Sequence, residues 1–157
     1  MKEVRFDDLP ALEALVSETF DEGFGSEIEI TQTMIDEFAK LTRDEQWIHV
    51  DDERCARESP FGKPIAHGFL VLSLLTALTR DGGTRIVGAG SVINYGADKL
   101  RFTSPVPSGS RVHARRRITH VRKKGVGGTQ LTFESEVWVV GADRPAMIYQ
   151  SIALFMP

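Results

Sequence analysis

The chain has 157 residues, of which 41% are hydrophobic, and its formal net charge is -3. This length and composition predict one compact domain over residues 1–157 with a core of its own. No apolar run approaches the roughly 20 residues of a membrane-spanning helix, and the N-terminus lacks the basic-then-apolar pattern of a signal peptide. We therefore expect a soluble, cytoplasmic protein without a membrane partner.

The only cysteine, Cys55, cannot form an internal disulfide, which suits a reducing compartment. Charge is distributed unevenly along the chain. Residues 1–60 carry 17 acidic and 6 basic side chains, a net -11, whereas residues 61–157 carry 5 and 13, a net +8. Such asymmetry fits association between chains or an anionic ligand on the basic part, and a solvated surface explains it about as well.

Two helices are expected in the first 43 residues. Pro10 opens the first, over residues 11–16, and Gly23 and Gly25 end it. Thr31 can cap the second helix, whose apolar residues recur at helical spacing and predict one buried face. These apolar residues are Met34, Ile35, Phe38 and Leu41.

Residues 42–64 have little periodicity apart from a possible short helix at 52–57, so we expect a long loop. Loops of this length are usually functional or disordered. Residues 68–78 are apolar all round and too short to span a bilayer, which predicts a helix buried on every side. After Asp81-Gly82-Gly83 the pattern changes to period two. The expected strands are residues 85–102, 110–123, 129–140 and 146–156.

Turn-forming residues at 105–109, 124–128 and 141–145 suit an antiparallel meander of these strands. One buried helix followed by such strands predicts an α+β fold, in which a curved antiparallel sheet wraps around the helix.

Asp44 and His49 place a carboxylate and an imidazole five residues apart in the expected loop, beside the apolar side chains of Trp47 and Ile48. Acid and base groups in such surroundings are suited to proton transfer. From spacing alone the alternative is stronger, namely that Asp44 caps the preceding turn and His49 is a hydrogen-bonded loop histidine.

Residues 64–68, with the sequence PIAHG, stand at the start of the expected buried helix. Backbone N–H groups there lack intrahelical acceptors and can bind a developing oxyanion, and Gly68 lets a substrate approach closely. Ordinary helix initiation is an equal alternative, with His67 bonded to a nearby carbonyl and Gly68 chosen for close packing.

Taken together, these motifs resemble those of a known family. Residues 44–49 (DEQWIH) and 61–68 (FGKPIAHG) resemble the MaoC-like dehydratases, which include the R-specific enoyl-CoA hydratases. Residues 46–51 (QWIHVD) and 93–96 (INYG) resemble the branch that includes the nodulation protein NodN and related mycobacterial hydratases. The likeness runs from about residue 30 to 112 and more loosely to the end. Many R-hydratases have Asn-Pro where this chain has Gln46-Trp47, which leaves loop shape and chain-length preference open.

The resemblance implies a hot-dog fold and a homodimer that binds an enoyl-CoA or 3-hydroxyacyl-CoA thioester near the subunit interface. It also implies that Asp44 and His49 hold the water that adds to the enoyl beta-carbon. The backbone N–H of Gly68 would polarise the thioester carbonyl, with His67 beside it. The family sometimes adds a hydroxyl from the central helix, here Thr76, although a buried helical hydroxyl more often bonds its own backbone. No metal or redox cofactor is required.

The predicted reaction is therefore reversible R-specific hydration of trans-2-enoyl-CoA to 3-hydroxyacyl-CoA. A non-catalytic acyl-thioester binder is the main alternative. A hot-dog thioesterase is a weaker one, because residues 68–79 contain no carboxylate. The basic runs 115–117 and 122–124 lack interleaved aromatics, so we expect a solvated sheet surface and no nucleic-acid partner. No spacing resembles a known set of metal ligands.

Overall fold

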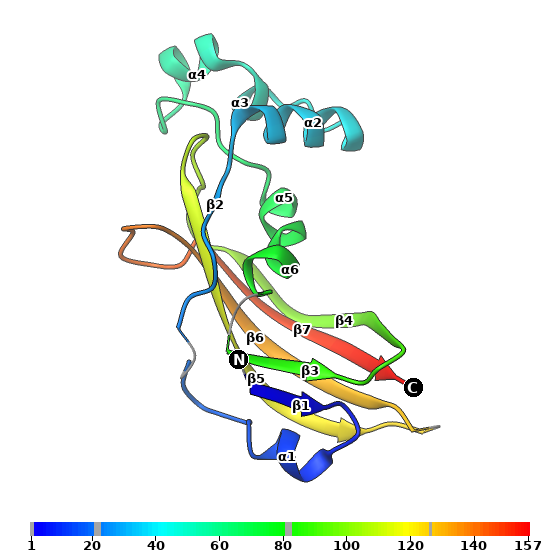
Figure 1. Cartoon of the computed structure of the whole chain (residues 1–157). Coiled ribbons are helices and arrows are strands. Elements are labelled where there is room, and N and C mark those ends of the chain that lie inside the picture. The colour runs from blue at the N-terminus through cyan, green and yellow to red at the C-terminus, as the bar shows by residue number, and fades with distance from the viewer. Residues whose placement is uncertain (1, 21–22, 81–82, 126) are drawn as a thin grey trace.

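A computed structural model describes residues 2–20, 23–80, 83–125 and 127–157 of the chain. Asp81, Gly82 and Val126, which contributed to the predicted turns, lie outside these residues. A long curved antiparallel sheet carries helices on one face, which confirms the predicted α+β class (Figure 1). Its strands, in spatial order, are β2 (Ile28–Glu29), β5 (Arg111–Lys123), β6 (Thr129–Val139), β7 (Met147–Met156) and β4 (Ser91–Phe102).

Three of the four expected strands are confirmed, because β5, β6 and β7 fall within a residue or two of the predicted bounds. The expected strand 85–102 is wrong as a single element. It divides into β3 (Thr84–Val87) and β4, and Gly88 between them has φ +85°, a left-handed conformation that ends a strand.

The predicted meander is wrong in its first connection. The hairpins between β5 and β6 and between β6 and β7 form, but β4 lies at the far edge of the sheet and pairs with β7 instead of β5. Residues 103–110 make no hairpin, because part of this loop pairs with the segment before the central helix, as in the bridge between Ile65 and Pro107.

The central helix is interrupted at Leu74 and forms α5 (Gly68–Ser73) and α6 (Leu75–Leu78). Its inner side packs into the main core against β5 and β6, with Leu70, Val71 and Leu78 buried. The expectation of burial on every side is wrong, because Phe69 is 63% exposed. No helix in the described ranges is long and apolar enough to cross a membrane.

The N-terminal residues contribute to a separate two-stranded sheet, which lies beyond the central helix (Figure 1). β1 (Lys2–Arg5) pairs in parallel with β3, and α1 (Leu9–Glu13) follows. A second core cluster joins Val4, Phe6 and Leu12 to β5, β6 and β7. The predicted helix 11–16 therefore starts and ends earlier, because Val16 leaves it to form a bridge with β5.

A layer of three helices covers the opposite end of the sheet (Figure 1). It comprises α2 (Gln32–Thr42), α3 (Trp47–Val50) and α4 (Asp52–Glu58). Thr31 caps α2 as predicted, its Oγ1 accepting from the Met34 N–H at 3.2 Å. Leu41 is 81% exposed, contrary to prediction, because the buried face of α2 runs through Ile35 and Ala39 instead. The expected loop 42–64 contains two short helices: α4 matches the helix expected at 52–57, whereas α3 was not predicted.

The two edges of the main sheet differ. Residues 16–20 and 23–29 cover the β5 edge, partly through the short strand β2, with Gly25 N–H donating to the Ala114 carbonyl at 2.8 Å. β4 forms the other edge and is exposed along nearly its whole length. Its exposed large apolar side chains are Val92, Ile93, Tyr95 and Phe102.

Candidate active site

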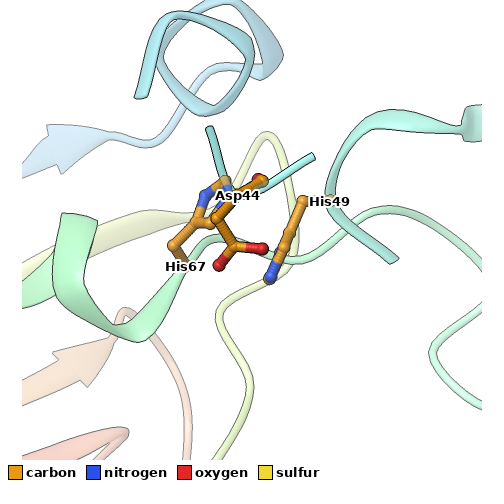
Figure 2. A group of neighbouring side chains, drawn as sticks. All are labelled: Asp44, His49 and His67. Atoms are coloured by element: carbon orange, nitrogen blue, oxygen red, sulfur yellow. The ribbon is translucent and has the colours of Figure 1, made fainter. Parts of the chain in front are cut away.

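Asp44, His49 and His67 reach one place from three different elements. α2 ends at Thr42, and Arg43 turns the chain through a left-handed conformation with φ 62°, which directs it to Asp44. His49 lies within α3, and His67 is the residue that precedes α5. The carboxylate of Asp44 lies alongside both imidazole rings (Figure 2).

His49 is held from two sides. Its Nδ1 donates to the Ile65 carbonyl at 2.7 Å, which leaves the lone pair of Nε2 available to accept a proton in the neutral ring. The Gln32 side chain donates to the His49 backbone carbonyl at 2.8 Å. Burial lowers the pKa of His49, with a smaller lowering from His67, while the Ile65 carbonyl and the Asp44 charge raise it. The net direction is downward, so neutral His49 can act as a base.

His67 contacts both Asp44 and His49. Its ring is 2% exposed, and its Nε2 donates to the backbone carbonyl of Asp44 at 2.8 Å. The rings of His67 and His49 stack with centroids 3.8 Å apart and an angle of 25° between their planes. Phe38 contacts the His67 ring as well, at 5.1 Å between centroids. His67 therefore connects the backbone of Asp44 to the ring of His49.

Carboxylate and imidazole groups also bind metal ions in proteins. One ligand atom each from Asp44, His49 and His67 lies within 4.8 Å of the others. A ligand nitrogen directs its lone pair in the plane of its ring, so two stacked rings 3.8 Å apart are poorly placed to aim at one ion. The geometry favours proton transfer at this cluster, and the lack of a metal requirement stays a prediction.

A cavity of about 470 Å³ opens beside His49 and is lined mostly by apolar side chains. Gly68 contributes to its wall at the first residue of α5, where the backbone N–H has no acceptor within the helix. The ring of Phe102 lies 2.9 Å from the point where a Cβ on Gly68 would stand. Any side chain at this position would therefore intrude on the cavity.

The structure brings Asp44, His49 and His67 together, and His49 and Gly68 share the cavity. Thr76 is not part of this site within one chain. It is exposed on α6 and lines a separate cavity of about 460 Å³ on the concave face of the sheet.

Two polar residues of the site were missed by sequence reasoning. Gln32 anchors the His49 backbone from α2, and Ser104 lines the cavity from the loop after β4. Gln32 directly follows the capping Thr31. The cap predicts where α2 begins, but it does not predict the contact between Gln32 and His49. Ser104 carries no local signal, because its position depends on how two distant segments pair.

The arginines of β5 are engaged within the sheet. Arg115 bonds Glu136 at 2.7 Å, and Arg117 bonds Glu134 at 3.0 Å. Period-two alternation places both on the same face of β5, as the sequence predicted. These two guanidinium groups are paired and partly buried, which makes them unsuited to a nucleic-acid surface, and the lack of such a partner stays a prediction.

Comparisons with known proteins agree with this geometry. Residues 17–139 match the MaoC like domain. Nodulation protein N of Rhizobium leguminosarum bv. viciae is 46% identical over 120 residues, which are 76% of this chain and 74% of that protein. The 3-hydroxyacyl-thioester dehydratase Z of Mycobacterium tuberculosis is 44% identical over 129 residues, 82% of this chain and 84% of the relative.

Among solved structures, an (R)-hydratase from A. caviae involved in PHA biosynthesis superposes with a TM-score of 0.69. Its sequence is 23% identical, and the match covers 90% of this chain and 98% of that one, which shows a shared fold. The chain thus belongs to the MaoC-like family of hydratases and dehydratases, on the branch that includes nodulation protein N, and has the hot-dog fold that the sequence predicted.

Proposed function

We propose that the protein hydrates trans-2-enoyl-CoA reversibly to (R)-3-hydroxyacyl-CoA. The observation that carries this proposal is the cluster of Asp44 and His49, whose functional atoms lie within 4.8 Å of each other, together with the mostly apolar cavity that His49 and Gly68 line. In this proposal the base His49 and the amide donor Gly68 border a space suited to an acyl chain. The names of the relatives, a dehydratase and an (R)-hydratase, support the same reaction class.

In this proposal one water molecule is held between the Asp44 carboxylate and the Nε2 lone pair of His49. The pair accepts one proton from the water as its oxygen bonds to the beta-carbon. Negative charge then develops on the thioester oxygen, where the Gly68 N–H stabilises it. The pair delivers one proton to the alpha-carbon, so that one water is added and the site returns to its starting state.

The test is the loss of the ultraviolet absorbance of enoyl thioesters, measured with purified protein over trans-2-enoyl-CoA esters of graded length. We expect turnover that Asp44→Asn and His49→Ala each reduce by about 10²- to 10⁴-fold without loss of fold. Coupling to dehydrogenases specific for (R)- or (S)-3-hydroxyacyl-CoA reports the stereochemistry. Folded protein that hydrates no chain length contradicts the proposal.

Two further measurements separate the rival functions. A thiol reagent detects free coenzyme A released from saturated acyl-CoA, which a thioesterase produces and a hydratase does not. Calorimetric binding of acyl-CoA without turnover, unchanged in Asp44→Asn, identifies a non-catalytic binder.

The active form in this proposal is a homodimer joined through β4. A long edge strand that exposes apolar side chains is normally covered by a partner, and β4 exposes Ile93 and Tyr95 at 47% and 57%. Light scattering after gel filtration should give twice the chain mass. Ile93→Lys should give monomers, whereas Leu41→Lys, which alters an exposed apolar residue on α2, should remain dimeric. A monomeric wild-type protein contradicts this part.

A further inference from the structure

Ser104 lines the site cavity, and its hydroxyl is turned away from that space, since it is fully buried and has no hydrogen-bond partner among the residues that the structure describes. The hydroxyl of the neighbouring Thr103 does have a partner, because it donates to the Pro145 carbonyl at 2.6 Å. A buried hydroxyl without a partner costs about 1–3 kcal/mol. Native proteins retain such groups where a ligand or water completes them. Rotation about the Cα–Cβ bond of Ser104 turns this unpaired donor toward the cavity that His49 and Gly68 also line.

The pairing of two loops places this donor near Gly68. The loop after β4 runs antiparallel to the segment before α5, with the Ala66 N–H donating to the Val106 carbonyl at 2.8 Å. This pairing includes the bridge between Ile65 and Pro107, and it ends just before α5 begins at Gly68. Phe102, the last residue of β4, packs its ring against Gly68, which keeps the two segments together at this point. Both Ser104 and Gly68 line the same cavity.

We infer that the Ser104 hydroxyl is a second hydrogen-bond donor to the thioester carbonyl oxygen, opposite the Gly68 N–H. The catalytic effect of this hydrogen bond rests on the proposed function. Ser104 is then a catalytic residue outside the two motifs at 44–49 and 61–68. Two fixed donors stabilise the charge that develops on the oxygen better than one. The backbone that carries the hydroxyl is also fixed, because the Thr103 N–H donates to the Ala146 carbonyl at 2.9 Å.

The kinetic test compares Ser104→Ala, Ser104→Thr and Ser108→Ala with the wild-type protein on a trans-2-enoyl-CoA. Ser104→Ala should lower kcat by about 10²-fold with little change in KM, because the lost bond strengthens in the transition state. Ser104→Thr keeps a hydroxyl and should recover much of the rate. Ser108 lies in the same loop but not in the cavity wall, so Ser108→Ala should retain the wild-type rate. Wild-type kcat in Ser104→Ala overturns the inference.

A binding measurement keeps the inference testable apart from the reaction. Calorimetry compares butyryl-CoA with its thioether analogue, which lacks the carbonyl oxygen. The wild-type protein should prefer the thioester, and Ser104→Ala should reduce that preference by about 3- to 10-fold, the value of one neutral hydrogen bond. An unchanged preference overturns the inference. A preference that depends on Ser104 in a protein that hydrates no enoyl-CoA contradicts the proposed function alone.

Discussion

The imidazole ring of His67 stacks on that of His49 at 3.8 Å while its Nε2 donates to the backbone carbonyl of Asp44. His67 thereby fixes both members of the proposed proton-transfer pair without lining the cavity. The family resemblance suggested a role at the oxyanion, whereas the geometry describes a positioning residue. Its second ring nitrogen, Nδ1, is buried and has no hydrogen-bond partner among the described residues.

We predict that the two contacts of His67 can be separated by substitution. His67→Phe keeps an aromatic ring but loses the donor to Asp44, and kcat should fall by about 10²-fold, the effect of a 1 Å misplacement of a reacting group. His67→Gln retains an N–H donor and should recover part of the loss. KM should change little in either variant. A large rise in KM with unchanged kcat would show direct contact with the substrate instead.

The lowered pKa of His49 predicts the pH dependence of activity. Burial keeps the ring neutral below its ordinary pKa of 6.5, so the acid limb of kcat/KM should lie below that value. The Asp44 charge acts in the opposite direction, and Asp44→Asn should therefore lower the pKa of His49 further. Proton NMR titration of the histidine rings measures this shift. His113, whose pKa is lowered mainly by its own burial, serves as the unchanged internal control.

The same shift affects stability with a defined sign. The unfolded chain protonates His49 at about pH 6.5, whereas the folded chain does so only at lower pH. The unfolded state thus binds more protons in this window, and the free energy of unfolding decreases as pH falls through it. His113 contributes in the same direction. Urea unfolding at several pH values should show a smaller pH dependence in a His113→Phe variant.

Local patterns were sufficient for a large part of this fold. Period-two alternation between turn residues predicted β5, β6 and β7, and the Thr31 cap predicted the start of α2. Both signals depend on neighbours within a few residues, which a single sequence displays. Two short motifs likewise predicted the meeting of His49 and Gly68 at one cavity.

Long-range pairing accounts for what the sequence did not predict. Nothing local distinguishes a β4 that joins β5 from one that crosses to β7, and the parallel pair of β1 and β3 joins segments about 80 residues apart. Ser104 belongs to the same class, because it reaches the cavity wall only after two loops have paired. His49 was expected in a loop, although its short helix α3 leaves the site geometry intact.

The role of Gly25 also differs from the one that the sequence predicted. It was expected to end a helix, but a Cβ at Gly25 would collide with the carbonyl oxygen of Leu78, whereas one at Gly23 would meet nothing within 4 Å. Gly25→Ala should therefore destabilise the protein by about 1–3 kcal/mol, the usual cost of overpacking. Gly23→Ala should be close to neutral. Thermal unfolding of the two variants measures the difference, and equal midpoints would contradict it.

Substitution of Gly68 should affect activity more than stability. A methyl group at position 68 would stand 2.9 Å from the ring of Phe102, and a side chain that is 45% exposed can move aside. Gly68→Ala should therefore unfold at nearly the wild-type temperature, yet lose much of its activity because the displaced ring and the methyl group enter the cavity.

Phe102→Leu supplies the test of this cause. In the Gly68→Ala background the smaller side chain relieves the contact, so the double variant should regain part of the lost kcat/KM, although Phe102→Leu alone gains nothing. Such a positive coupling in a double-mutant cycle identifies the pair as neighbours that act together. Additive losses would mean that the methyl group itself excludes the substrate from the Gly68 N–H, with the Phe102 ring uninvolved.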